Sequence, residues 1–380
     1  MRVIWLLVLL HTYIGWRIAP QLPGALVPAL FVTVLVLSAA LVPAGFWGRR
    51  AGNRVAADRW TWAGMMALGL LSMLLLLTLL RDLLLLLAWP FAASFALPPL
   101  AAPTAIAVPL LALAAWLLGL FGARRTARVR DVAVPIAGLP AALDGFTIVQ
   151  ISDVHVGPTV KAPYVQAIVD AVNRLGADAV AITGDLVDGR VHDLRADVAP
   201  LAGLRSRHGS FFVTGNHEYY SGATEWTVAL RSIGLRVLNN EHVVLEHGGA
   251  KLVMAGVTDF SAGHFDRSQH SDPQRAIAGA PADAGVRVLL AHQPRSAPAA
   301  ADAGFNLQLS GHTHGGQFWP WNLFVRLQQP YTAGLHRLRG LWVYTSRGTG
   351  YWGPPLRLGA PSEITRLRLT AAPAQAKGSA

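Results

Sequence analysis

The residues of this sequence that could do chemistry are histidine, aspartate and asparagine side chains placed directly after short apolar runs. Five runs between residues 146 and 309 are followed by such groups. One polar residue at a strand end is typical of capping or hydrogen bonding, but five in succession predict a metal site. Carboxylate, imidazole and amide ligands together suit divalent Mn, Fe, Zn or Co. The five groups are Asp153-Val154-His155, Gly184-Asp185-Leu186-Val187-Asp188, Gly215-Asn216-His217-Glu218, His292 and Gly311-His312-Thr313-His314.

The number of these groups suits two metal ions better than one. Two ions about 3.5–4 Å apart hold the attacking and leaving oxygens of an in-line displacement and lower the pKa of a bridging water toward neutrality. That chemistry is phosphoester hydrolysis, and it needs no serine or cysteine nucleophile. The chain contains no cysteine, which excludes disulfides, iron–sulfur clusters and thiol catalysis. We therefore expect hydrolysis by attack of a metal-bridging hydroxide.

The elements that must position these groups belong to an α/β domain, because short buried strands alternate with amphipathic helices. In such folds ligands bind beyond the carboxyl ends of the strands. Gly184, Gly215 and Gly311 are expected to allow the tight turns that bring the polar groups together. The last strands indicate a second sheet. The expected strands are 146–152, 178–183, 210–214, 243–256 (two strands broken at Gly248-Gly249), 286–291, 305–309, 341–346 and 362–369, and the expected helices are 163–175, 191–205 and 223–233.

In this order and spacing, the five motifs resemble the blocks of the calcineurin-like metallophosphoesterase superfamily over residues 146–315. The resemblance implies a four-layer α/β/β/α sandwich with two sheets. It also implies two divalent metal ions, with Asp185 bridging them. The first ion would be held by Asp153, His155 and His314, and the second by Asn216, His292 and His312.

The same resemblance assigns two residues to catalysis. His217 would face the leaving oxygen as general acid or oxyanion stabiliser, and Asp188 would orient its ring. Glu218 fits a structural role better than a direct one. Gly189 follows Asp188 where protein phosphatases of the superfamily have Arg, so phosphoprotein phosphatase activity is not expected.

Three motifs from Gly311 onward resemble a bacterial, membrane-anchored, phosphodiesterase-type branch of this superfamily. The motifs are Gly311–Gln317, Arg347–Gly350 and Trp352–Pro355. Arg347 follows a strand, and two interpretations stay open: it pairs with a substrate phosphate, or it forms a surface salt bridge.

Residues 1–122 have the composition of a membrane region. They hold seven of the 32 basic residues and two of the 21 acidic ones. A bilayer core about 30 Å thick needs about 20 mostly apolar residues per helix. Four runs are long enough, near 3–20, 23–47, 60–89 and 103–122. Arg81 and Asp82 lie inside the third run, where we expect structural accommodation rather than transport chemistry.

The arginines beside these runs predict the orientation of the chain. By the positive-inside rule they lie in the cytoplasm, so the large domain is expected on the cytoplasmic side of the inner or plasma membrane. The other arginines are dispersed, and the net charge of +11 therefore predicts no nucleic-acid partner. The flanking residues are Arg49, Arg50, Arg54 and Arg59 after the second run, and Arg124, Arg125, Arg128 and Arg130 after the fourth.

The sequence thus predicts a multi-span helical membrane region at 1–122, a linker and domain entry at 123–145, the phosphoesterase domain at 146–370 and a disordered tail at 371–380. The aromatic segment at 318–331 either contacts lipid headgroups or packs as an insertion over the second sheet. The oligomeric state is left open.

The primary hypothesis is a membrane-anchored enzyme that hydrolyses a phosphodiester or pyrophosphate bond, with a lipid-linked phosphoester as one candidate substrate. The alternative is a membrane receptor or scaffold that uses the phosphoesterase fold as a binding module. The complete set of expected ligands argues against this alternative, because a decayed site usually lacks one or more of them.

Overall fold

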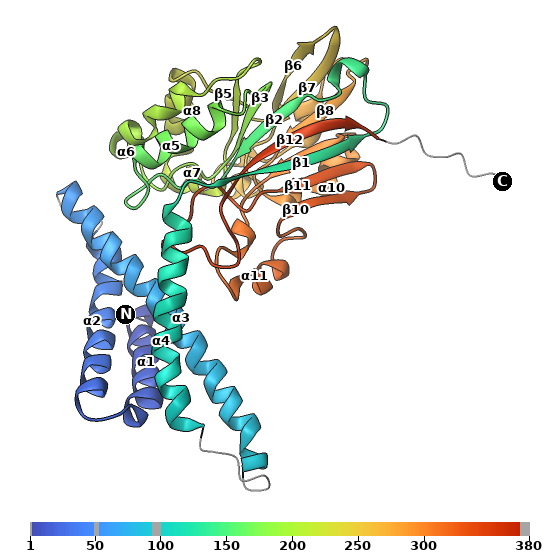
Figure 1. Cartoon of the computed structure of the whole chain (residues 1–380). Coiled ribbons are helices and arrows are strands. Elements are labelled where there is room, and N and C mark those ends of the chain that lie inside the picture. Colours follow the sequence, from blue (N-terminus) through green and yellow to red (C-terminus); the bar gives the residue numbers. More distant parts are fainter. Residues whose placement is uncertain (1, 49–52, 93–99, 373–380) are drawn as a thin grey trace. The chain divides into compact units, whose positions relative to one another are not determined.

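The computed structural model describes residues 2–48, 53–92 and 100–372. The chain divides into two compact units (Figure 1). The helical unit comprises Met1–Arg124 together with Gly353–Leu358. The second unit, which we call the catalytic unit because the residues predicted for catalysis lie in it, comprises Arg125–Trp352 and Gly359–Ala380.

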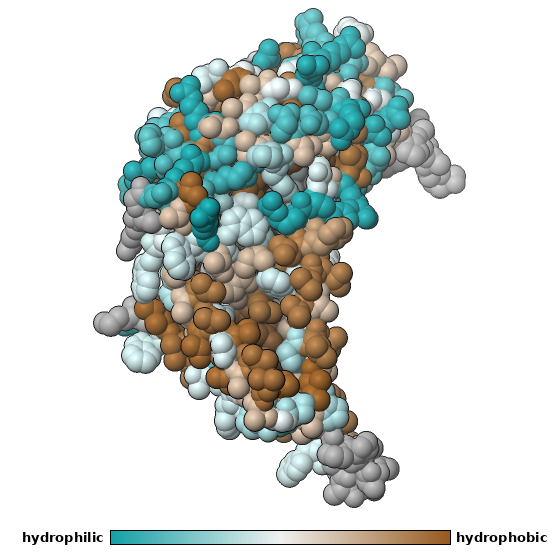
Figure 2. Space-filling model, turned by 60° about the vertical axis from the view of Figure 1, so that its left-hand side comes forward, coloured by the Kyte–Doolittle hydropathy of each residue, from teal (hydrophilic) through white to brown (hydrophobic). Residues whose placement is uncertain are grey.

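The helical unit contains four helices that are long and apolar enough to cross a membrane, as the sequence predicts. Large apolar side chains are exposed along them, and Figure 2 shows this apolar surface in brown. The third helix is continuous over 39 residues, so residues 60–89 form one segment and not two. Arg49 and Arg50 lie outside the described residues. The helices are α1 (Arg2–Ile18), α2 (Leu26–Gly48), α3 (Arg54–Ala92) and α4 (Ala101–Arg124).

The two charged residues inside the third apolar run are accommodated by partners on neighbouring elements. Asp82 accepts hydrogen bonds from Arg17 Nε at 2.7 Å and from Tyr13 Oη at 2.6 Å. Arg81 is buried and donates to Gln21 Oε1 at 2.5 Å. A buried charge that is paired and hydrogen-bonded avoids the cost of an isolated one. These contacts agree with the expected structural role.

The segment Gly353–Leu358 belongs to the helical unit although the residues on either side of it belong to the catalytic unit. Leu356 is buried against two glycines, Gly69 of α3 and Gly119 of α4. A Cβ at Gly69 would lie 2.8 Å from a Leu356 methyl group, and a Cβ at Gly119 would lie 3.2 Å from the other. Arg357 N donates to Gly119 O at 2.8 Å. The two glycines therefore create the space that Leu356 fills.

The catalytic unit contains two six-stranded sheets, which confirms the expected two-sheet α/β class. In the first sheet β2 to β5 run parallel, and β12 is antiparallel to β2. In the second sheet β7, β8, β9 and β11 run parallel, with antiparallel strands at both edges. The first sheet, in spatial order, is β1 (Arg128–Ile136), β12 (Glu363–Ala371), β2 (Thr147–Ile151), β3 (Ala179–Thr183), β4 (Ser210–Val213) and β5 (Arg236–Val237). The second is β10 (Gly334–Leu338), β11 (Leu341–Thr345), β9 (Leu307–Ser310), β8 (Val286–Leu290), β7 (Ala250–Gly256) and β6 (Glu241–His247).

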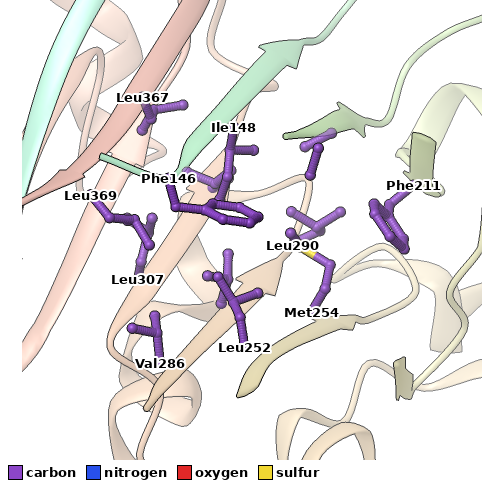
Figure 3. Close-up of a cluster of buried hydrophobic side chains, with 14 of the residues drawn as sticks. Phe146, Ile148, Phe211, Leu252, Met254, Val286, Leu290, Leu307, Leu367 and Leu369 are labelled. Atoms are coloured by element: carbon purple, nitrogen blue, oxygen red, sulfur yellow. The ribbon is translucent and has the colours of Figure 1, made fainter. Parts of the chain in front are cut away.

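The core lies between the two sheets, where alternate side chains of both sheets interleave (Figure 3). The core includes Phe146, which directly precedes β2, and Ile148 and Phe211 of the first sheet. These side chains pack with Leu252 and Leu290 of the second sheet. Burying one such side chain contributes about 1.5–3 kcal/mol. The outer layers are helical: α5 (Ala162–Asn173), α6 (Val191–Val198) and α8 (Ala223–Ser232) flank the first sheet, and α9 (Pro273–Ile277) and α10 (Ala297–Asp302) cover the second (Figure 1).

The segment expected to be a linker, 123–145, contains strand β1. It pairs with β12 over nine residues, from Arg128 opposite Glu363 to Ile136 opposite Ala371. The first half of β1 contains three charged residues, Arg128, Arg130 and Asp131. The strand also includes Pro135, which is tolerated because β1 is an edge strand. Strand β12 continues to Ala371, and residues 373–380 of the expected tail lie outside the described residues.

Candidate metal centre

The predicted ligands follow the carboxyl ends of five strands that belong to both sheets. Asp153 and His155 follow β2, and Asp185 follows β3. Asn216 begins helix α7 (Asn216–Ser221) after β4. The last three come from the second sheet: His292 follows β8, and His312 and His314 follow β9.

One cluster consists of Asp153, His155 and His314. The Nε2 atoms of His155 and His314 lie 3.0 Å apart, and His314 Nε2 lies 3.6 Å from Asp153 Oδ1. One ligand atom from each residue lies within 4.8 Å of the others. The side chains of Asp153 and His155 are almost inaccessible to solvent, and that of His314 is 12% exposed. This group can hold a metal ion.

A second cluster consists of Asp185, His292 and His312. His292 Nε2 lies 3.1 Å from Asp185 Oδ2 and 3.2 Å from His312 Nδ1. Asp185 Oδ2 is also 3.9 Å from His155 Nε2 in the first cluster. The carboxylate of Asp185 therefore lies between the two groups of ligands.

Two features of these residues fit a metal ion. Among the described residues, Asn216 Oδ1 is one of the buried side-chain atoms without a hydrogen-bond partner, and an unpaired buried oxygen is costly unless a ligand satisfies it. Burial and the neighbouring His292 lower the pKa of His312 to about 3. His312 is thus a neutral imidazole, which is the form that binds metals.

The backbone is strained at most of the predicted ligands. Non-glycine residues with positive φ are uncommon, and they concentrate at functional sites. Of the eight such residues that the described part of the chain contains, five are predicted ligands. The five are Asp153 (φ 53°), His155 (54°), Asp185 (50°), His312 (69°) and His314 (51°).

The motif glycines act in two ways. Gly184 has a φ of +84°, as expected for a tight turn, and a Cβ there would lie 2.7 Å from His292 Nδ1. Gly215 and Gly311 do not need a left-handed backbone. They are required because a Cβ would overlap Asp185 Oδ1 at position 215, and Asp153 Oδ2 at position 311. At these two glycines, the backbone can therefore pass close to the carboxylate of a predicted ligand.

Replacing Gly311 with alanine is expected to destabilise the protein and weaken metal binding, because the new Cβ would overlap Asp153 Oδ2 and Ser152 Oγ. Forcing an extra methyl group into a packed site costs about 1–3 kcal/mol. Thermal unfolding and metal titration of the full chain measure both effects. Gly340→Ala is the matched control, since nothing lies within 4 Å of a Cβ there. Equal effects of the two substitutions would contradict the steric explanation.

Asp188 holds two histidines through one oxygen. Its Oδ1 lies 2.6 Å from His217 Nδ1 and 3.0 Å from His155 Nδ1. Burial disfavours the charged imidazolium of His217, but Asp188 and Asp185 outweigh it and raise the pKa of His217 to about 9. Burial also opposes ionisation of Asp188, but the two histidines lower its pKa below the usual range. Asp188 therefore stays a carboxylate.

His217 also forms a third group of potential ligands with His155 and Asp185. Its Nε2 lies 3.9 Å from Asp185 Oδ2, while its Nδ1 is engaged by Asp188. The exposed rings of Tyr220 and Trp352 flank it, with centroids 5.3 and 5.5 Å from the imidazole. His217 thus lies at the edge of the site that solvent can reach.

Glu218 has a structural role. It is fully buried and accepts hydrogen bonds from the N–H groups of Gly215 at 2.6 Å, Asp185 at 3.0 Å and Leu186 at 2.8 Å. Burial and the charge of Asp185 raise the pKa of Glu218 to about 8, against the effect of these donors. Because it bonds the loops after both β3 and β4, Glu218 fixes their separation.

Arg347 lies against a buried carboxylate. Its Nη1 is 3.4 Å from Glu363 Oε2, and its backbone N–H donates to Glu363 Oε1 at 3.1 Å. Arg347 therefore forms a salt bridge, and its contact with a substrate phosphate stays a prediction.

Sequence reasoning missed groups that act through the backbone or from distant segments. The carbonyl oxygen of Thr183 lies 2.7 Å from His292 Nδ1 and orients that ring. Trp352 reaches His217 from a loop more than a hundred residues away. A contact made by a backbone carbonyl group leaves no signal in the residue types. The sequence motif that contains Trp352 is recognisable, but the position of Trp352 beside His217 is not.

Comparison with known proteins agrees with this geometry. Residues 146–316 match the family described as calcineurin-like phosphoesterase. An uncharacterized metallophosphoesterase of Aquifex aeolicus is 33% identical over 239 residues, which cover 62% of this chain and 89% of that relative. The chain belongs to the calcineurin-like phosphoesterases.

Other relatives of this phosphoesterase are matched over only part of their length. A transmembrane protein with metallophosphoesterase domain from Bos taurus is 42% identical, and the match covers 67% of this chain and 60% of that protein. An uncharacterized metallophosphoesterase of Helicobacter pylori is 41% identical, with 58% and 59% covered. The chain thus spans about three fifths of the length of these curated relatives. The chain thus combines a calcineurin-like phosphoesterase domain, which carries the His/Asp clusters, with candidate membrane spans.

Proposed function

We propose that the phosphoesterase uses two divalent metal ions and hydrolyses a phosphodiester or pyrophosphate bond. The observation that carries this proposal is the position of Asp185 between two clusters of ligands, 3.1 Å from His292 Nε2 and 3.9 Å from His155 Nε2. A single ion would not need ligands on both sides of this carboxylate. The first ion is assigned to Asp153, His155, Asp185 and His314, and the second to Asp185, Asn216, His292 and His312.

When bound, the two ions supply Lewis acidity that activates water and holds phosphate oxygens. The chain supplies the rest of the chemistry. Asp185 and Asp153 bring negative charge to the site, and Thr183 O and Asp188 orient the rings of His292 and His155. His217 presents Nε2 to the leaving oxygen and donates a proton to it. Asp188 holds the opposite nitrogen of that ring. The mixed donor set suits Mn, Fe, Zn or Co.

The substrate side of the proposal rests on the rings beside His217. Tyr220 and Trp352 are more than half exposed at this edge of the site. Exposed aromatic rings next to the proton donor favour a leaving group with an apolar or planar part over a small polar one. Together with the four candidate spans, this supports a lipid-linked phosphoester and the phosphodiesterase-type branch of the family.

We also place the catalytic unit on the cytoplasmic side of the inner or plasma membrane. Arg54 and Arg59 lie in the first turns of α3, and Arg124 ends α4. Basic residues at these two helix ends, with a loop free of charged residues between the helices, support a cytoplasmic location for both ends by the positive-inside rule.

Removal of metal is expected to abolish turnover. The full chain, purified in detergent, is treated with a chelator and assayed on a chromogenic phosphodiester, then reassayed after addition of Mn²⁺. We expect loss of activity and its recovery, because the proposed nucleophile is a water molecule that the two ions activate. Turnover that persists at a metal content near zero would contradict the proposal. Metal binding without turnover on any phosphoester would favour a binding module instead.

Turnover is expected to decline as the pH rises through about 9. A general acid acts in its protonated form, and the pKa of His217 is raised to about 9, so the protonated fraction is high below that pH and falls above it. The measurement is the pH–rate profile on a phosphodiester with a poor leaving group. His217→Asn should remove this descending limb, and an unchanged limb in that variant would assign it to another group.

A further inference from the structure

A contiguous run of apolar side chains projects into solvent from the catalytic unit at residues 319–327. It includes helix α11 (Trp321–Phe324) and the following 3₁₀ turn (Val325–Leu327). Exposed apolar patches on soluble domains usually mark interaction sites. The exposed fractions are 40% for Trp319, 50% for Trp321, 58% for Leu323, 53% for Phe324 and 83% for Leu327.

The segment is held in place at both ends. Before it, Gly316 packs so closely on Asn322 that a Cβ would overlap the Asn322 backbone. After it, Arg295 Nε donates to Gln328 O at 2.8 Å, and Gln329 Nε2 donates to Gln293 Oε1 at 3.2 Å. The polar residues thus make the contacts with the rest of the unit, and the apolar ones face outward.

The charged residues in the sequence around the segment have one sign. Residues 303–362 contain no aspartate or glutamate, and Arg326 is exposed within the apolar run. Tryptophan, phenylalanine and leucine mixed with arginine are typical of segments that lie at a lipid headgroup boundary, where aromatic rings settle and cations meet anionic lipids. A protein partner that covered this face would need an apolar and acidic surface.

We propose that residues 319–327 bind the headgroup region of an anionic lipid bilayer. The helical unit has four candidate membrane spans, so a bilayer is the apolar phase to which every copy of the chain is tethered. The segment is also joined to the metal centre: Gln317 donates to Trp352 O and accepts from Trp352 N, both at 2.8 Å, and the Trp352 ring lies 5.5 Å from that of His217. Binding there would present the rim of the site to lipid headgroups.

The absence of cysteine allows a direct test. Leu327→Cys and, separately, Phe324→Cys are introduced into the full chain, labelled with an environment-sensitive fluorophore and reconstituted into vesicles of phosphatidylcholine and phosphatidylglycerol. Val228→Cys on α8, where the native side chain is 64% exposed, is the matched control. Insertion about 5–10 Å into the headgroup boundary should blue-shift the emission, and brominated lipids should quench it by about half or more. The probe at 228 should show neither change.

Two results would overturn the proposal. Emission at 324 and 327 that matches the control at 228, and is insensitive to brominated lipid, would mean that the face does not meet the bilayer. Emission that changes with protein density in the vesicle, but not with bromination, would mean that a second copy covers the face. Neither readout depends on enzymatic activity, so the test stands even if the proposed reaction is wrong.

Discussion

Replacing Asp185 with asparagine is expected to remove at least one metal ion per chain and to lower turnover by about a thousandfold or more, since metal ions supply several kcal/mol of transition-state stabilisation. The reason is the shared position of this carboxylate. Its Oδ2 is 3.1 Å from His292 Nε2, and its Oδ1 accepts the N–H of His217 at 2.9 Å. Asparagine keeps the shape of the side chain but removes the negative charge that, in the proposed site, holds two cations close together.

The measurements for Asp185→Asn are metal content by mass spectrometry and turnover of a chromogenic phosphodiester at saturating Mn²⁺. Asp193→Asn is the matched control, because Asp193 is an exposed aspartate near the start of α6 that does not reach the metal centre. A variant that keeps two metals and full activity would show that Asp185 is not shared between two ions. Loss of the metals together with unfolding would be detected by circular dichroism of the same samples.

Replacing His217 with asparagine is expected to lower kcat by about 10²–10⁴-fold while metal content stays unchanged, as for the loss of a general acid. His217 is engaged by Asp188 at Nδ1 and is not needed to complete either three-residue cluster. A leaving group of low pKa departs without a proton. The penalty should therefore be small for a nitrophenyl leaving group and large for an alkyl one.

This dependence on the leaving group separates the two roles that the geometry allows for His217. If His217 were a metal ligand, as its group with His155 and Asp185 permits, the variant would lose metal and slow all substrates alike. His192→Asn is the matched control, because the His192 side chain is 95% exposed. Equal slowing of nitrophenyl and alkyl esters with intact metal content would also exclude the general acid role.

The site was predictable from sequence because its chemistry lies next to the strands that position it. Asp153, Asp185 and His292 each follow a buried strand within a few residues, and parallel strands bring their carboxyl ends to one edge. The left-handed backbone at Asp153 and Asp185 could not be predicted, since it depends on contacts between loops of different strands. The requirement for glycine at position 311 could not be predicted either. It arises because a Cβ there would overlap Asp153, which is distant in the sequence, and not because of the local turn.

Strand β1 is not predicted from the sequence, and the reason is a different one. In β1, Arg128, Arg130 and Asp131 interrupt the apolar pattern, and Pro135 is unfavourable in a central strand. Such a stretch is indistinguishable from a linker until its partner is known, and that partner is β12, more than two hundred residues later. Local pattern therefore identifies buried central strands more readily than exposed edge strands.

The placement of Gly353–Leu358 in the helical unit has a consequence for how this protein can be divided. The chain passes between the two units three times, after Arg124, after Trp352 and after Leu358. A fragment that starts at Arg125 would keep Leu356 but lose Gly69 and Gly119, and with them about 1.5–3 kcal/mol of burial for that side chain. No single cut yields a fragment of the second unit that is free of sequence from the helical unit, because the residues of the two units alternate along the chain.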